Sequence, residues 1–236
     1  MLLVYVMVSM LLLRVLIARF SPYIYDAVIL HMTKVWYAVV LRRLPRGASL
    51  LDIGIGTASA LLVNAPLLDS QDVSIVGIDY DAPYIDAARA AVAAHGVTRR
   101  VKVHCMSVYD ADALSALRPP TGDLFDAAYF SGSLTLMPNP VAAIVAVARM
   151  VKPGGLIYVT QTYQRRALPL LAWVKPLLKY ATTIDFGQLT YEHDVRRIYD
   201  EAATVAGVRV TEHAAIPGSL NNRLQVARLS ILEVPS

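Results

Sequence analysis

The chain is poor in cysteine and in charged residues, and each shortage excludes a class of protein. Cys105 is the one cysteine among 236 residues, which excludes a disulfide framework and any metal site built from several cysteines. Cys105 lies in the apolar-flanked run VKVHCM, which favours a buried structural thiol over a nucleophile. Charged residues make up 17% of the chain and hydrophobic residues 56%. A mean hydropathy of +0.48 is high for a freely soluble enzyme.

Acidic residues are absent before Asp26, and much of the apolar excess lies in the same part of the chain. In residues 1–13 only Ser9 is polar, and Arg14 then interrupts the run. A helix that spans a bilayer needs about 20 apolar residues, so this run is short unless Arg14 extends to the interface. A cleaved secretory signal fits poorly, because no basic region precedes the run and no small-residue cleavage site follows it. Membrane anchoring or interfacial insertion is therefore the favoured interpretation. A helix packed against the domain or a partner, and a targeting peptide, are the alternatives.

The net charge of +4 and the pI near 9.2 suggest an acidic partner. The basic residues occur as scattered pairs and not as a stripe interleaved with aromatic residues, so nucleic acid is not favoured. An anionic membrane surface fits the joint basic and apolar excess better. If residues 1–20 span a membrane, the basic residues that follow place the domain on the cytosolic side. A mitochondrial membrane is an alternative location, because mitochondrial presequences also lack acidic residues.

The strongest local signal is residues 50–61, LLDIGIGTASAL. An apolar strand leads to Asp52, then to Gly54 and Gly56, and small residues begin a helix. In a parallel α/β sheet such a turn binds nucleotide-like ligands, and the glycines permit left-handed backbone and close approach. A dinucleotide fingerprint needs a further glycine where this chain has Ser59, so a nicotinamide oxidoreductase is disfavoured. The alternative interpretation is an ordinary glycine-rich turn between a strand and a helix, without a role in ligand binding.

A second signal is Asp79, which ends an apolar strand predicted over residues 73–78. A carboxylate at the end of the second strand can accept hydrogen bonds from both hydroxyls of a ribose. Asp81 stands two residues before Pro83 and is predicted to cap a helix over residues 82–95. Further strands are predicted over residues 101–106, 125–130 and 156–160, and helices over residues 22–44, 140–151 and 191–207.

The order of these motifs resembles the class I S-adenosylmethionine-dependent methyltransferase family over residues 23–162. The matching features are D-x-G-x-G at residues 52–56, Asp79, F-D-A-A at residues 125–128 and K-P-G-G at residues 152–155. Ala58 stands where the family often has a third glycine. The resemblance implies an α/β fold, with a Rossmann-like, seven-stranded, mostly parallel sheet, helices on both faces and a C-terminal antiparallel hairpin. It also implies one domain over residues 21–236, preceded by a hydrophobic helical extension over residues 1–20, with a variable substrate-covering segment at residues 163–190.

The resemblance further implies S-adenosylmethionine as the cofactor and no metal. It assigns cofactor contacts to Asp52, Gly54, Gly56, Asp79, Tyr80, Ser107, Val108 and Ser131. The family's acid after the third strand has no direct counterpart, so either Ser107 makes that contact or Asp110 reaches back. An amine acceptor needs no base, whereas a hydroxyl acceptor needs one, and Tyr25, His31 and Tyr129 are the candidates. His31, alone in an apolar helix, is also readily interpreted as a core residue.

The predicted function is methyl transfer to a small, apolar or lipid-like acceptor at a membrane. The end of the fourth strand, residues 131–133, is S-G-S and lacks the N/D-P-P-Y/F pattern of enzymes that methylate planar amide or nucleobase nitrogens. Residues 167–180 are apolar and aromatic with basic edges, which suits a cover over a lipid-like acceptor, although an ordinary packed insertion explains them too. The alternative function is a catalytically inactive methyltransferase-like subunit of a membrane-bound assembly.

Overall fold

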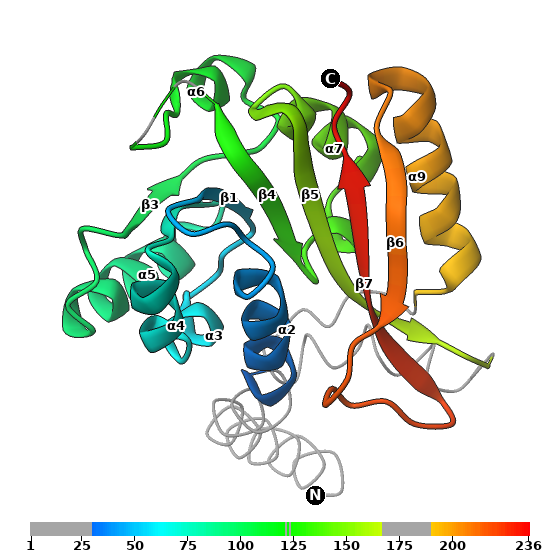
Figure 1. The fold of residues 1–236 in the computed structure, drawn as a ribbon, viewed down its shortest axis with the longest axis horizontal. Helices are drawn as coiled ribbons and strands as arrows, with labels where there is room; N and C mark the ends of the chain where they lie inside the picture. The colour runs from blue at the N-terminus through cyan, green and yellow to red at the C-terminus, as the bar shows by residue number, and fades with distance from the viewer. Residues whose placement is uncertain (1–29, 121, 123, 167–189) are drawn as a thin grey trace, which may run out of the picture.

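The computed structural model describes residues 30–120, 122, 124–166 and 190–236, which fold around one seven-stranded sheet (Figure 1). The strand order is β3-β2-β1-β4-β5-β7-β6. The strands are β1 Ser49–Ile53, β2 Ser74–Asp79, β3 Val101–Cys105, β4 Phe125–Ser131, β5 Val151–Gln164, β6 Arg209–Ala215 and β7 Gln225–Glu233. The first five are parallel, and β7 runs antiparallel to both β5 and β6. The predicted fold class and its C-terminal hairpin are confirmed.

Helices cover both faces of the sheet, because successive side chains of each buried strand point to opposite faces. The helices are α2 His31–Leu41, α3 Ser59–Leu62, α4 Ala65–Gln71, α5 Ala82–Ala94, α6 Ala111–Ala116, α7 Pro140–Ala148 and α9 Glu192–Ala206. Leu50 belongs to the core beneath α2 to α5, whereas its neighbour Leu51 belongs to the core beneath α6, α7 and α9. Burial on both faces explains why these strands read as continuous apolar runs.

Local capping signals fix several helix starts as the sequence predicts. The Asp81 carboxylate accepts a hydrogen bond from the backbone N–H of Tyr84 at the start of α5. Asn139 caps α7 in the same way through the N–H of Ala142 at 3.0 Å. The helix expected after the glycine loop is instead divided into α3 and α4, and the Asn64 side chain at the break donates to the backbone oxygens of Lys34 and Ala60.

The prediction that Cys105 is buried is wrong. The thiol is exposed, and its Sγ lies 3.7 Å from the backbone oxygen of Tyr80. Cys105 ends β3, one of the two edge strands of the sheet, so among the described residues no strand pairs with its outer side. The apolar residues around it in the sequence indicate a strand but not a central one.

The described residues contain no helix that is both long and apolar enough to cross a membrane. Three predicted features lie outside the described residues. They are the N-terminal extension, the start of the helix expected from residue 22, and nearly all of the segment 163–190. The domain boundaries and the membrane anchor therefore stay predictions. The described part of that first helix, α2, ends at Leu41, three residues earlier than expected.

Candidate functional site

The loop between β1 and α3 is shaped by two glycines in the left-handed region. Gly54 has a φ of +78°, and a Cβ placed on it would lie 2.6 Å from the Cβ of Ser133, in the loop after β4. Gly56 has a φ of +57°, and a Cβ there would meet no atom of the described residues within 4 Å. The loop is therefore pressed against the end of β4 at Gly54 and open at Gly56, where a ligand can approach the backbone.

Ala58, in the place of the family's third glycine, has a φ of 59° and so keeps the left-handed backbone that a glycine would supply. For a residue with a Cβ, this conformation costs about 1–3 kcal/mol unless the surroundings enforce it. Ala58 is buried in the core beneath α2 to α5, which supplies that enforcement. The departure from the family pattern thus changes the side chain but not the course of the loop.

Asp79 ties this loop to the end of β2. Its Oδ2 accepts a hydrogen bond from the backbone N–H of Gly56, and its Oδ1 accepts one from the N–H of Asp81, both at 3.0 Å. Burial raises the pKa of the Asp79 carboxyl above its ordinary value, and these hydrogen bonds oppose the rise. Each carboxylate oxygen has a second lone pair, so Asp79 can still accept hydrogen bonds from a ligand.

Asp52, near the end of β1, is fully buried and only half satisfied. Its Oδ2 accepts a hydrogen bond from the Tyr37 hydroxyl at 2.7 Å, whereas Oδ1 has no hydrogen-bond partner among the described residues. Burial raises the pKa of Asp52 to about 7; the Tyr37 hydrogen bond lowers it, and the nearby Asp79 carboxylate raises it further. A cationic ligand group would supply the partner that Oδ1 lacks.

The remaining predicted cofactor residues line the carboxyl ends of β2, β3 and β4. Tyr80 is 81% exposed and Val108 is buried. Ser107 is half-buried, and its hydroxyl accepts from the N–H of Tyr109 at 3.2 Å. Ser131 is the last residue of β4 and pairs with Thr160 of β5. Their contacts with a cofactor stay predictions.

Asp110 does not reach back toward this edge. Its carboxylate accepts from the N–H of Ala113 at 3.1 Å and caps α6. Of the two alternatives for the contact after the third strand, this favours Ser107, whose hydroxyl can still donate; the contact itself stays a prediction.

The candidate catalytic residues have three different outcomes. Tyr25 lies outside the described residues. His31 is exposed at the start of α2, so it is not a core histidine. Tyr129 is fully buried, its hydroxyl lies 2.8 Å from the Thr160 Oγ1, and its ring packs edge-on against Tyr37 at 5.1 Å. Burial also raises its pKa. Tyr129 is thus unsuited to act as a base, because its strand position turns it toward α2 and away from solvent.

Two residues that shape this site are not indicated by any motif in the sequence. Tyr37 of α2 is the hydrogen-bond partner of Asp52, and the Ser133 hydroxyl donates to the backbone oxygen of Ile53. The apolar pattern of α2 signals that Tyr37 is buried, but no local pattern links it to Asp52. Among the described residues, no three potential metal ligands come together.

Comparison with known proteins identifies the same part of the chain. Residues 50–155 match the family model described as a methyltransferase domain. The chain is 25% identical over 139 residues to the phosphatidylethanolamine N-methyltransferase of Cereibacter sphaeroides, covering 59% of this chain and 63% of that protein. It is 31% identical over 136 residues to the ubiquinone biosynthesis O-methyltransferase of Xylella fastidiosa (strain 9a5c), covering 57% of this chain and 50% of that protein. The matches thus span less than two thirds of either relative.

Solved structures share the fold at low sequence identity. The [4+2]-cyclase SpnF has a TM-score of 0.63 at 18% identity, with 86% of this chain and 81% of that chain covered. A SAM-dependent methyltransferase from Geobacter sulfurreducens, in complex with S-adenosyl-L-homocysteine, has a TM-score of 0.57 at 17% identity. The match covers 87% of this chain and 93% of that chain. At these identities the likeness establishes the architecture alone.

Proposed function

The chain contains a methyltransferase domain of the class I, S-adenosylmethionine-dependent family, and we propose that it transfers the methyl group of that cofactor to a small, lipid-like acceptor. The observation that carries the proposal is the coincidence of two findings. The methyltransferase family model matches residues 50–155, and within that range Asp79 is hydrogen-bonded to the open loop residue Gly56. Family and geometry therefore indicate one site at the carboxyl edge of β1 and β2.

The residues at this edge fit the cofactor. Gly56 leaves free space in front of the loop, Asp79 retains lone pairs for ribose hydroxyls, and Asp52 carries a buried oxygen without a partner. S-adenosylmethionine bears a positively charged sulfonium and an ammonium group, so a carboxyl group without a cationic partner suits it electrostatically. A third glycine is not required, because Ala58 keeps the same backbone conformation.

When bound, S-adenosylmethionine supplies a methyl group already activated by its positively charged sulfur. The tasks left for this chain are to bind, to orient and to exclude water. Asp79 and the loop at Gly54 and Gly56 would hold the cofactor against the sheet edge. Rigid positioning of the cofactor and the acceptor accounts for much of the rate acceleration in such a transfer. An amine acceptor needs no base from the protein.

The proposed acceptor side of the site is formed by small, uncharged residues and by Trp36. The S-G-S turn after β4 carries no charge, and a Cβ on Gly132 would lie 3.3 Å from the buried Trp36 ring. The Trp36 indole donates to the Ser219 hydroxyl at 3.0 Å, which fixes the β6–β7 loop beside it. These features support an apolar acceptor, as do two relatives named for a phospholipid and for ubiquinone biosynthesis. The predicted cover at residues 167–180 lies outside the described residues.

We expect the binding of S-adenosylmethionine to depend on Asp79. Asp79→Asn should weaken the affinity by about 1.5–3 kcal/mol, the range for a hydrogen bond to a charged group, which is roughly 10- to 150-fold. Isothermal titration calorimetry measures the change. Asp86→Asn, an exposed acid on α5, is the matched control and should bind as the wild type does. Equal affinities for both variants would show that Asp79 does not hold the cofactor.

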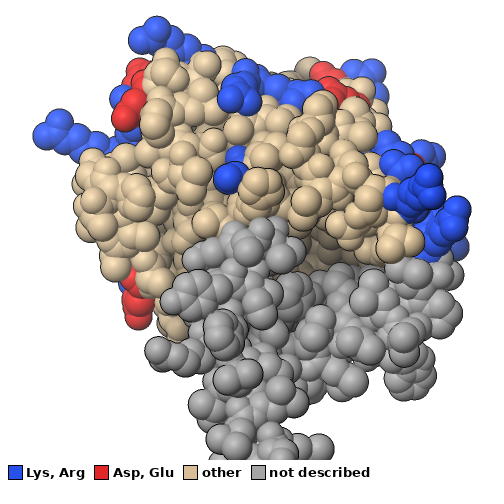
Figure 2. All heavy atoms as spheres, turned by 90° about the horizontal axis from the view of Figure 1, so that it is seen from below, with Lys and Arg blue, Asp and Glu red and all other residues tan. Residues whose placement is uncertain are grey.

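A membrane surface is the proposed place of reaction. Figure 2 shows the molecule from below: where residues are described, this face is largely uncharged, with Lys and Arg side chains mainly toward its border and few acidic ones. Leu220 and Leu224 in the β6–β7 loop are 40% and 46% exposed. A largely uncharged face with basic residues toward its border suits an anionic bilayer, and the apolar run in residues 1–18 adds to it in the sequence.

Deleting residues 1–19 should move the protein from the membrane fraction to the soluble fraction while leaving the fold intact, because the described sheet is complete without them. Fractionation and circular dichroism of the full and shortened chains measure both effects. A shortened chain that aggregates or loses cofactor binding would show that these residues belong to the core.

The second candidate function is a non-catalytic, methyltransferase-like subunit. The structural similarity to a [4+2]-cyclase supports this second candidate. A protein with this architecture can thus be named for an activity other than methyl transfer. Transfer of a labelled methyl group from S-adenosylmethionine to a lipid extract separates the two. Tight cofactor binding without any transfer would favour the subunit.

A further inference from the structure

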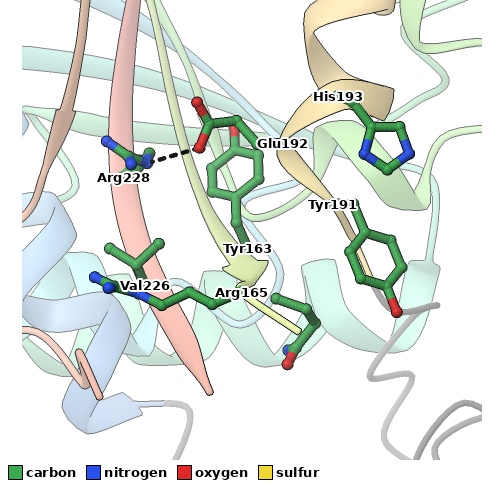
Figure 3. A pocket seen from close by; sticks show the side chains of 8 residues that line it. Tyr163, Arg165, Tyr191, Glu192, His193, Val226 and Arg228 are labelled. Carbon is green, nitrogen blue, oxygen red and sulfur yellow. Dashed lines mark ion pairs between the residues drawn. The ribbon is translucent and has the colours of Figure 1, made fainter. Parts of the chain in front are cut away.

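A second polar site lies where β5 and β7 meet the start of α9, outside the residues assigned to the cofactor. An open cavity of about 470 Å³ is lined there mainly by Tyr163, Arg165, Tyr191, Glu192, His193 and Arg228. Figure 3 shows Tyr163 in the middle, Arg228 beside Glu192, and Tyr191 and His193 together on the α9 side. Tyr191 and His193 stack with ring centroids 5.7 Å apart, which gives the cavity one flat wall.

Positive charge exceeds negative charge around this cavity. The Glu192 carboxylate accepts from Arg196 at 2.8 Å and also faces Arg228 and His213, each at 3.4 Å. Burial opposes its ionisation, yet these cationic neighbours hold the pKa of Glu192 below its usual value. The single carboxylate of Glu192 is thus shared by Arg196 and Arg228. Arg165 adds a third guanidinium, which has no carboxylate partner within the described part of the chain.

The polar groups left without partners at the cavity can nearly all donate. Tyr163 is 1% exposed, and its hydroxyl makes no hydrogen bond of proper geometry among the described residues, although the Tyr199 and Ser230 side chains lie close enough to lower its pKa against the effect of burial. The Nε of Arg228 is buried and, in the same described part, makes no hydrogen bond of proper geometry. No side chain caps α9; the Asp194 N–H donates to the backbone oxygen of Tyr191 at 3.2 Å, whereas the N–H groups of Glu192 and His193 have no partner within the helix. Within the described residues, arginines that outnumber their carboxylate partner and donors without an acceptor suit an anionic ligand with several oxygens.

We infer that this cavity binds a phosphate group. Phosphate oxygens accept from guanidinium groups, from a hydroxyl and from the N–H groups at a helix start at the same time. The group can come from free phosphate or from the headgroup of a phospholipid. Phosphate binding here does not depend on the methyltransferase activity; only its assignment to the acceptor's headgroup rests on the proposed function. β5 connects the two sites, since Thr160 pairs with Ser131 and Tyr163 follows three residues later.

The test is calorimetric titration of the full chain with two probes at constant ionic strength: inorganic phosphate, and a short-chain phosphatidic acid kept below its micelle concentration. Both should bind the wild type, and Arg165→Gln and Arg228→Gln should each weaken binding at least about tenfold, as expected for a lost charged hydrogen bond. Arg197→Gln, an exposed arginine of α9 that does not line the cavity, is the matched control and should leave both affinities unchanged.

The two probes separate the sources of the phosphate. Tighter binding of the lipid than of inorganic phosphate would identify a headgroup site, and equal binding would identify a site for the phosphate group alone. Absence of binding of both probes, or binding that neither arginine variant weakens, would overturn the inference. Arg165 is exposed, so Arg165→Gln keeps the test valid if Arg228→Gln fails to fold. Titration of S-adenosylmethionine into the same samples tests the proposed function separately, because that affinity should not change.

Discussion

Gly54→Val should abolish measurable cofactor binding and destabilise the fold by more than about 3 kcal/mol. Two independent costs combine at this position. The φ of +78° lies where a β-branched residue is strained, and the new Cβ would lie 2.6 Å from the Cβ of Ser133. Ser133 cannot easily yield, because its hydroxyl donates to the backbone of Ile53. Denaturant unfolding measures the loss of stability, and titration with S-adenosylmethionine measures the loss of binding.

Gly47→Val is the matched control. Gly47 has a φ of +79°, so it shares the backbone strain, but in the described part of the chain a Cβ there meets nothing within 4 Å. We expect this variant to lose only the strain energy, about 1–3 kcal/mol, and to bind the cofactor normally. Equal losses in the two variants would show that the close approach to Ser133 does not shape the loop. Normal cofactor binding by a folded Gly54→Val would show that the loop is not the cofactor loop.

The parts of this site that the sequence predicts are those determined by neighbours in the chain. The glycine loop, Asp79 at the end of its strand and Asp81 at the start of its helix are all specified within a few residues by turn and capping chemistry. The strand order then follows from the family resemblance, and it brings the ends of β1 and β2 together.

The parts that the sequence does not predict are contacts between distant segments. Tyr37 and Asp52 come from different elements, and the approach of Gly54 to Ser133 joins the ends of β1 and β4. Tyr129 shows the second difficulty, since it lies only two residues before the strand end and yet faces the core. A shift of one residue in the predicted strand register places a side chain on the opposite face of the sheet. The sequence pattern of β4 therefore cannot decide whether Tyr129 is a catalytic base or a core residue.

Asp52 should make the stability of the ligand-free protein fall between about pH 4 and pH 7. Its pKa is raised from 3.8 to about 7, chiefly by burial. Below pH 4 the carboxyl is protonated in both the folded and unfolded chains, and its contribution to stability is complete. Between the two pKa values the unfolded chain has released the proton and the folded chain retains it, so each pH unit costs about 1.4 kcal/mol. Above about pH 7 the loss levels off, at a total on the order of 4 kcal/mol.

Asp52→Asn removes this titration while keeping an oxygen that can accept from the Tyr37 hydroxyl. The difference in unfolding free energy between variant and wild type should therefore grow in favour of the variant from about pH 5 to pH 7 and then stay constant. Asp126→Asn is the matched control, because Lys152 and Ser49 hold the pKa of that carboxyl below its usual value against the opposing effect of burial. Asp126 is then ionised throughout this range, so its variant should run parallel to the wild type. Urea unfolding at several pH values gives all three curves, and an Asp52→Asn curve parallel to the wild type would show that Asp52 titrates normally. The same result would remove the electrostatic reason to place a cationic end of the cofactor beside it.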